Sequence, residues 1–133
     1  MEAALGRLTR SSFRRKQRLS KTDAADAKRR GRETIRRHAA EILGDRLAPA
    51  QPVNDGKQTP FRGHAVFTAQ HATATCCRSC LAKWHAIDKG RPMRDDEVAY
   101  ATALIVAWID RQLESRWEAS ARPCLPLFDD TDM

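Results

Sequence analysis

Three of the four cysteines and two of the four histidines of this 133-residue chain lie in one short stretch, residues 71–85. Thiolate sulfur and imidazole nitrogen are the ligands that zinc prefers, and four of them complete a tetrahedral site. Two of the cysteines form a C-x2-C pair, a spacing that is typical of zinc knuckles. The stretch therefore predicts a zinc site. Its expected ligands are His71, Cys77, Cys80 and His85.

Cys76 and His64 are further candidate ligands for the same site. Adjacent cysteines rarely both bind one zinc ion in a simple knuckle, so we prefer Cys77, which completes the C-x2-C pair, to Cys76. Three other interpretations stay open beside a structural zinc ion. Free cysteine is among the most buried residue types, so the cysteines and a hydrogen-bonded histidine can belong to the core without any metal.

A redox or iron–sulfur role is the next alternative. The C-x-x-C pair lacks a thioredoxin-like βαβ context, and three cysteines leave a four-iron cluster one thiolate short unless Cys124 joins. The last alternative is a catalytic metal ion or a cysteine nucleophile. That chemistry needs an open ligand position and a nearby base, for which Glu97 and His64 are only nominal candidates.

Positive charge is concentrated in the first third of the chain. Residues 1–43 carry 13 Lys/Arg against 5 Asp/Glu, a balance of +8, whereas residues 44–133 carry 11 against 12, a balance of −1. A local excess of this kind attracts polyanions, of which nucleic acid is the commonest. The alternative is that these side chains only solvate the protein. The expected nucleic-acid contacts are Arg14, Arg15, Lys16, Arg18, Arg29, Arg30, Arg36 and Arg37.

Base stacking of the single-strand type is not expected in this region, because it has no row of aromatic residues and Phe13 is its only one. The chain contains no run of about 18 apolar residues, and its first residues lack the apolar core of a secretory signal. A cytoplasmic protein without a membrane partner is therefore expected. The Arg- and Ser-rich start also fits a mitochondrial presequence. The sequence leaves the oligomeric state open.

Apolar periodicity predicts a small, mainly α domain with one irregular loop and a Cys/His metal knot. Helices are expected over residues 21–30, 32–47, 77–86 and 95–117, with Ser20 as an N-cap and Gly31 ending the first of them. The last helix has a long apolar stripe, which is expected to bury its central residues. The stripe includes Leu104, Ile105, Trp108 and Ile109.

We expect a flexible basic arm over residues 1–19, one helical domain over residues 20–118 and an acidic tail over residues 119–133. The Pro- and Gly-rich residues 48–63 break the helical pattern. Residues 65–67 could form a short strand or the first turn of a helix, and they are expected to be extended because a single strand has no evident partner. The polar residues 55–59 could hold an anion, although they lack the spacing of a P-loop. The two helices that meet at Gly31 weakly resemble a helix-turn-helix, in which the second helix reads the major groove.

The stretch His71-Ala-Thr-Ala-Thr-Cys-Cys-Arg, followed by Cys80-Leu81 and Lys83-Trp84-His85, resembles a bacterial and phage domain family of unknown function. The resemblance extends over about residues 20–115 and implies no activity. It implies a bacterial cytoplasmic or phage-encoded protein, which disfavours the mitochondrial interpretation. Family members often begin the last helix with a small hydroxyl residue. This chain has Arg94 there, so capping is expected to pass to Asp95.

These features favour a zinc-stabilised helical accessory protein that binds nucleic acid through its basic N-terminal third. Two alternatives remain. One is a metal-dependent enzyme acting on nucleic acid, although the sequence contains no recognisable His-Asn-His nuclease motif. The other is a protein-interaction adaptor that uses the long last helix.

Overall fold

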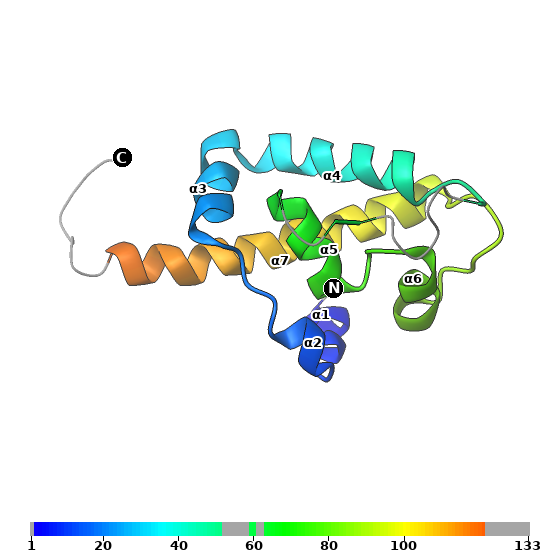
Figure 1. Cartoon of the computed structure of the whole chain (residues 1–133), viewed down its shortest axis with the longest axis horizontal. Helices are drawn as coiled ribbons and strands as arrows, with labels where there is room; N and C mark the ends of the chain where they lie inside the picture. Colours follow the sequence, from blue (N-terminus) through cyan, green and yellow to red (C-terminus); the bar gives the residue numbers. More distant parts are fainter. Residues whose placement is uncertain (1, 52–58, 61–62, 122–133) are drawn as a thin grey trace.

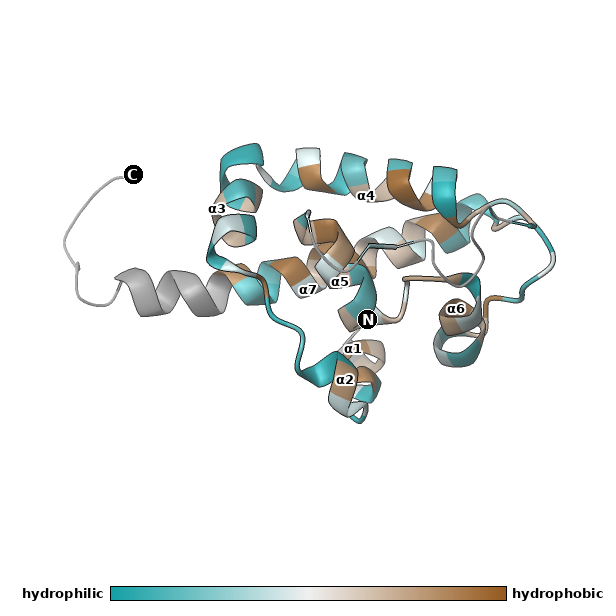
Figure 2. Cartoon of the chain, viewed as in Figure 1, coloured by the Kyte–Doolittle hydropathy of each residue, from teal (hydrophilic) through white to brown (hydrophobic). Residues whose placement is uncertain are grey.

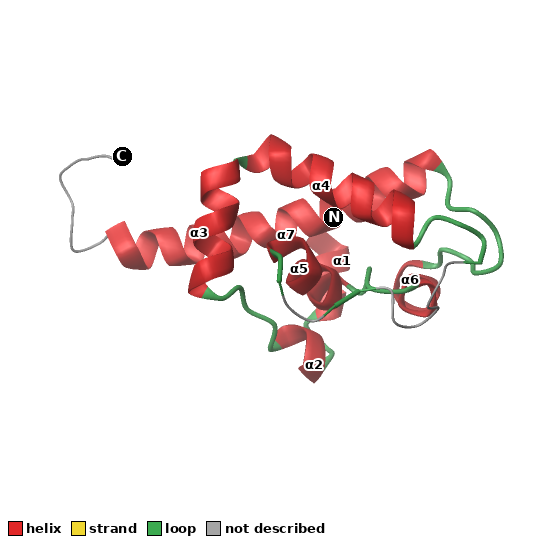
Figure 3. Cartoon of the chain, turned by 45° about the horizontal axis from the view of Figure 1, so that its top comes forward, coloured by secondary structure: helices red, strands yellow, loops and turns green. Residues whose placement is uncertain are grey.

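The computed structural model of the chain describes residues 2–51, 59–60 and 63–121, with side chains as far as residue 113. These residues form seven helices and no strand, which confirms the predicted mainly α class with more helices than the four expected (Figure 3). The helices are α1 (Glu2–Leu8), α2 (Ser12–Arg15), α3 (Lys21–Arg30), α4 (Arg32–Arg46), α5 (Ala65–Thr73), α6 (Arg78–His85) and α7 (Asp95–Ala121).

Helices α4 and α7 run antiparallel along the length of the molecule, and α5 packs on both of them (Figure 1). Helix α3 crosses near one end of this pair, and α6 lies toward the other end. The core between them is built from fully buried side chains, among them Leu43, Leu47, Val66, Leu81 and Ile105. Polar residues dominate α3, whereas α7 carries apolar residues along much of its described length (Figure 2). No helix in the described part of the chain is long and apolar enough to cross a membrane.

The α3–α4 pair confirms the sequence prediction at both ends of α3. The Ser20 hydroxyl accepts a hydrogen bond from the Asp23 amide across 3.0 Å, as an N-cap residue does. Gly31 ends α3 with φ +89°, a conformation that glycine adopts without steric cost. Ile35, Ala39 and Leu43 then form the predicted buried stripe of α4.

Helix α7 begins at Asp95, as predicted, and continues to Ala121, one turn beyond the predicted end. Leu104, Ile105 and Ile109 are buried, which confirms most of the expected stripe. Trp108 is only partly buried and packs at the border of the two apolar clusters, so its predicted full burial is wrong. A large ring at such a border keeps one edge toward solvent.

The prediction of an extended segment at residues 65–67 is wrong, because this segment is the first turn of α5. The His64 ring caps α5: its Nδ1 atom accepts a hydrogen bond from the Val66 amide across 3.0 Å. Nearly every residue of α5 is buried. A helix that is covered on all sides shows no amphipathic period, so the sequence pattern that reveals α3, α4 and α7 is missing here.

The segment expected to be a basic arm contains α1 and α2. Ala4, Leu5 and Leu8 of α1 are buried and form a second apolar cluster with Leu104 of α7. The N-terminal residues are therefore packed against the same helix that carries the core of the domain.

Arg78 is fully buried, and its guanidinium lies between two loops. Its guanidinium donates hydrogen bonds to the carbonyl of Leu47 across 3.0 Å and to the carbonyl of Arg91 across 2.8 Å, and also to the carbonyl of Asp88. A single side chain from the first turn of α6 thus ties the loop after α4 to the connector before α7. The expected anion-binding loop, residues 55–59, lies outside the described residues except for Thr59.

Candidate metal centre

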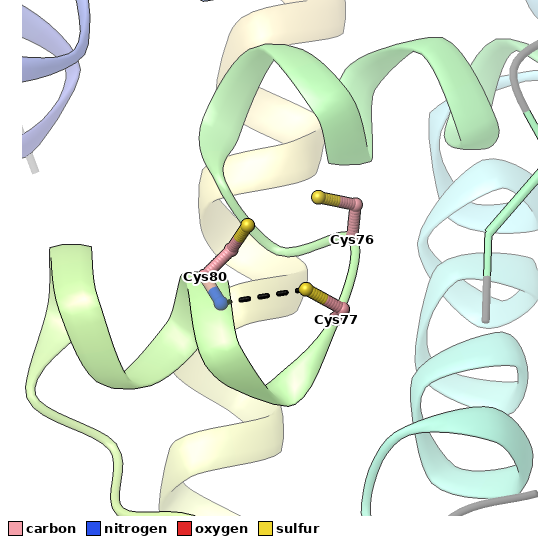
Figure 4. Close-up of side chains that lie close together, drawn as sticks. All are labelled: Cys76, Cys77 and Cys80. Carbon is pink, nitrogen blue, oxygen red and sulfur yellow. Dashed lines mark hydrogen bonds between the residues drawn. The ribbon is translucent and has the colours of Figure 1, made fainter. Parts of the chain in front are cut away.

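The sulfur atoms of Cys76, Cys77 and Cys80 lie within 4.8 Å of one another (Figure 4). Cys76 and Cys77 come from the turn between α5 and α6, and Cys80 comes from the first turn of α6. Cys76 and Cys77 are buried, and Cys80 is partly buried. Three thiols in one partly enclosed space form a donor set that can hold a soft metal ion.

The backbone conformation of this segment accompanies the meeting of three cysteine side chains from five consecutive residues. Helix α5 ends at Ala74, which adopts a left-handed conformation with φ +60° and reverses the chain. Cys77 is then extended and caps α6: its sulfur accepts a hydrogen bond from the Cys80 amide across 3.4 Å. This bond holds the Cys77 sulfur over the first turn of α6, next to the side chain of Cys80 (Figure 4).

Arg14 of α2 reaches the same cluster from a distant part of the chain. Its guanidinium donates hydrogen bonds to the Cys80 sulfur across 3.2 Å and to the His71 carbonyl across 2.6 Å. The same group lies 5.5 Å from the centre of the Trp84 ring. A fixed positive charge therefore lies directly beside the cysteine cluster.

The neighbours of Cys76 and Cys80 shift the pKa values of these two thiols in opposite directions. Hydrogen bonds from the Cys76 and Cys77 thiols lower the pKa of Cys80, and the adjacent Arg14 guanidinium lowers it further. Hydrogen bonding to Cys77 and Cys80 raises the pKa of Cys76, and burial adds to this effect. Cys80 therefore ionises before Cys76, and a thiolate is the form of cysteine that binds metal.

The structure places His71 beside this cluster but outside the group of three. Its Nε2 atom lies 3.3 Å from the Thr59 carbonyl and 3.2 Å from the Pro60 carbonyl, and it donates toward both because a carbonyl oxygen only accepts. Burial lowers the pKa of His71. The Thr59 hydroxyl in turn donates to the Cys76 carbonyl across 2.7 Å, so the ring and this loop are fixed together.

His85 also lies outside the group of three, with a partner on each ring nitrogen. Its Nε2 atom donates to the Thr73 carbonyl across 2.8 Å, and its Nδ1 atom lies 3.2 Å from the Tyr100 hydroxyl. Burial lowers the pKa of His85, which favours the neutral ring that these two contacts need. In this arrangement His85 links α6 to the end of α5 and to α7.

Of the four predicted metal ligands, the structure therefore brings together Cys77 and Cys80, and it adds Cys76 in place of a histidine. His64, the other candidate, lies away from the cysteines, with its Nε2 atom 3.3 Å from the Nδ1 atom of His38. The sequence offered Cys76 as a further candidate, and its position next to Cys77 was the reason to prefer Cys77. In the structure the sulfurs of these adjacent residues lie within 4.8 Å of each other. Cys124 lies outside the described residues.

Comparison with known protein families matches residues 2–110 to a domain of unknown function, DUF4186. This chain belongs to that family. The match includes all helices from α1 to α6, the three clustered cysteines and the part of α7 that forms the core. No solved structure matches this DUF4186 domain.

The basic residues expected to contact nucleic acid fall into two groups in the DUF4186 domain. Arg29 and Arg30 form ion pairs with Asp26 on α3, and Arg36 pairs with Glu33 on α4. Arg37 is exposed on α4. In the other group, Arg15, Lys16 and Arg18 are exposed in and after α2, whereas Arg14 points to the cysteines.

The capping prediction for the start of α7, which named Asp95, is wrong. The Arg94 amide donates to the Glu97 carboxylate across 2.9 Å, so Glu97 rather than Asp95 satisfies this end of α7. Glu97 also receives two hydrogen bonds of 2.8 Å from the guanidinium of Arg91. These partners, Arg91 first, lower the pKa of Glu97 to about 2. A carboxylate held in this way is a poor general base at neutral pH.

Proposed function

We propose that this protein is a zinc-stabilised helical accessory protein that binds nucleic acid through its basic N-terminal third. The observation that carries the zinc proposal is the meeting of the Cys76, Cys77 and Cys80 sulfurs within 4.8 Å. Soft thiolate ligands select zinc among the common divalent ions. The pKa of Cys80 is lowered, which favours its thiolate, and a bound ion would favour the thiolate form of the other two cysteines.

A tetrahedral zinc ion needs a fourth ligand beyond the three sulfurs. His71 or His85 can supply it once its ring leaves the backbone carbonyl that it now contacts, and water occupies the position otherwise. A closed set of four protein ligands is typical of structural zinc, whereas a water ligand is typical of catalytic zinc. The ligand count therefore also separates the accessory protein from the alternative of a metal-dependent enzyme.

Metal analysis of the purified, zinc-loaded and desalted protein tests the site. We expect about one zinc ion per chain, and its loss in Cys76→Ser, Cys77→Ser and Cys80→Ser. Ser79→Ala is the matched control, because Ser79 lies in the same turn with its side chain outside the cluster. Wild-type protein with no more zinc than the Cys80→Ser variant would overturn the proposal. Zinc loss in His71→Ala or His85→Ala would identify that histidine as the fourth ligand.

Nucleic-acid binding is supported by the charge balance of +8 in residues 1–43 against −1 in the remainder. Each phosphate that a basic side chain neutralises releases a counterion, so affinity should fall steeply as salt rises. Gel shifts with DNA and RNA at about 50 mM salt, where such contacts are strong, test this part. A failure to bind either polymer would leave the adaptor alternative. Zinc-dependent cleavage of a plasmid would instead favour the enzyme.

A further inference from the structure

Phe13 is the exposed large apolar side chain of the described part of the chain, with 49% of its surface accessible. It lies in α2, a single turn of helix with no buried residue. An exposed phenylalanine costs free energy of hydration that a small polar residue would avoid. Single exposed apolar residues are common at protein surfaces, so a ligand for Phe13 is inferred only from what surrounds the ring.

The Phe13 ring is exposed but held in place. The guanidinium of its neighbour Arg14 lies 5.9 Å from the centre of the Phe13 ring, and it bonds to the Cys80 sulfur and the His71 carbonyl. The His71 ring packs edge-on against Phe13, with 6.3 Å between the ring centres. Helix α2 is thus fastened to the cysteine cluster while it presents an aromatic ring at the surface. A ligand would find this ring largely preorganised.

Basic residues flank Phe13 on both sides in the sequence. Four exposed basic residues lie within five positions of Phe13, namely Arg10, Arg15, Lys16 and Arg18. Arg15 and Arg18 donate to backbone carbonyls, and none of the four forms an ion pair with a described acidic residue. The basic residues of α3 and α4 differ, because Arg29, Arg30 and Arg36 are already paired with carboxylates.

An exposed ring amid unpaired positive charge matches a polyanion that carries flat aromatic groups. Single-stranded nucleic acid has both, since its phosphates follow the backbone and its bases are free to stack on a side chain. Inside a duplex the base faces cover one another, so a protein ring cannot reach them without unstacking. An anionic membrane surface is less suitable, because one phenylalanine offers little apolar area for insertion.

We propose that Phe13 and the four basic residues around it bind single-stranded nucleic acid, with one base stacked on the Phe13 ring. This inference rests on the proposed nucleic-acid binding, and it names the site and the substrate class. The sequence alone does not predict base stacking here, because Phe13 is the only aromatic residue of the region; the exposure of its ring is what the structure adds, and one ring holds one base. Arg15, Lys16 and Arg18 contact the neighbouring phosphates.

Fluorescence anisotropy with a labelled 12-nucleotide oligo-dT strand and with a duplex of the same length tests the proposal on the full chain. We expect tighter binding to the single strand. Phe13→Ala should weaken that binding at least about five-fold, the lower end of what stacking on one base contributes. Phe13→Trp should preserve it, because the indole face also stacks. Circular dichroism should be unchanged in both variants, since the ring is exposed.

A matched pair of triple variants locates the phosphate contacts. Changing Arg15, Lys16 and Arg18 to Gln should reduce the salt slope for the single strand by about 2, at about 0.7 per phosphate contact. Changing the paired residues Arg29, Arg30 and Arg36 to Gln should reduce it less. Equal effects of the two triple variants would overturn the assignment to α2.

The outcomes separate this inference from the proposed function. No binding of either oligonucleotide at low salt removes the proposed nucleic-acid function and the inference with it. Equal affinity for strand and duplex, or an unchanged affinity in Phe13→Ala, overturns the inference alone. Binding of the wild-type protein to phosphatidylglycerol vesicles but not to oligonucleotides, lost in Phe13→Ala, would assign the surface to a membrane instead.

Discussion

The guanidinium of Arg14 donates a hydrogen bond of 3.2 Å to the sulfur of Cys80, and so joins the second helix to the cysteine cluster across 66 positions of the chain. The same side chain bonds to the His71 carbonyl and lies over Trp84. Arg14 was expected from the sequence to face nucleic acid. Its position instead gives it a part in the electrostatics of the cluster, because a thiolate next to a guanidinium is stabilised.

Replacing Arg14 with Gln should raise the pKa of Cys80 toward that of an ordinary thiol. The positive charge favours the thiolate, so its removal shifts ionisation to higher pH. The rate of Cys80 alkylation by iodoacetamide, followed by mass spectrometry from pH 5 to pH 9 on metal-free protein, measures this shift. Arg15→Gln is the matched control, since Arg15 donates to the Thr9 carbonyl rather than to sulfur. Identical pH profiles for wild type and Arg14→Gln would contradict the prediction.

Zinc removal should destabilise the protein, because an ion that binds only the folded state adds to its free energy of unfolding. Free zinc at a hundred times its dissociation constant would contribute about 2.7 kcal/mol. Thermal melts with zinc and with EDTA measure the difference. Cys80→Ser should show no response to zinc, whereas Ser79→Ala should respond as the wild type does. A wild-type melt that EDTA leaves unchanged would make the cysteines ordinary core residues.

The helices that the sequence predicted are those with a signal on the chain itself. Ser20 and Gly31 mark the ends of α3, and the apolar stripes of α4 and α7 each face one side. Helix α5 has no such stripe because it is buried nearly all round, and α1 is only seven residues long. Local patterns therefore indicate helices at the border of the core better than helices inside it.

The candidate site was predictable in its composition but not in its geometry. The density of cysteines in residues 76–80 indicated a metal site. The grouping of Cys76 with Cys77 and Cys80 follows a left-handed turn at Ala74, a conformation that a non-glycine residue rarely adopts and that the sequence does not indicate. Other contacts join different helices or segments far apart in the chain. His85 contacts Thr73 and Tyr100, and Arg14 contacts Cys80. No spacing rule indicates such contacts.

Stability should fall as the pH drops below about 6.5, the ordinary pKa of histidine. Burial lowers the pKa of His64, His71 and His85, so these rings are neutral in the folded protein and take up protons more readily when it unfolds. Their contribution is present above the unfolded pKa and is lost as the pH falls through the folded pKa. Urea unfolding between pH 5 and pH 8 measures this dependence.

His64 offers a specific variant for the same experiment. Its Nδ1 atom accepts the Val66 amide at the start of α5, and protonation there removes the acceptor. Its Nε2 atom faces His38, and Arg30, Asp26 and Asp23 also act on its charge. Asparagine caps helices without titrating, so His64→Asn should retain the fold and reduce the pH dependence. A variant with the full wild-type pH dependence would exclude His64 as a contributor.

Glu97 should stabilise the protein through its charge, and Glu97→Gln should lower the free energy of unfolding at pH 7 by about 1 to 3 kcal/mol, the range for hydrogen bonds to a charged group. Glutamine can still accept the Arg94 amide, so the change isolates the loss of the ion pairs with the Arg91 and Arg94 guanidinium groups. The pKa of Glu97 is about 2 in the folded protein against 4.5 as its ordinary value. Its contribution is therefore complete above about pH 4.5 and is lost as the pH falls toward 2.

Urea unfolding of the wild type and of Glu97→Gln at pH 7 and pH 3 should show a smaller difference in the free energy of unfolding at pH 3. Asp96→Asn is the control, because its exposed pair with Arg94 should contribute little. A difference between wild type and Glu97→Gln that stays constant with pH would contradict this electrostatic role.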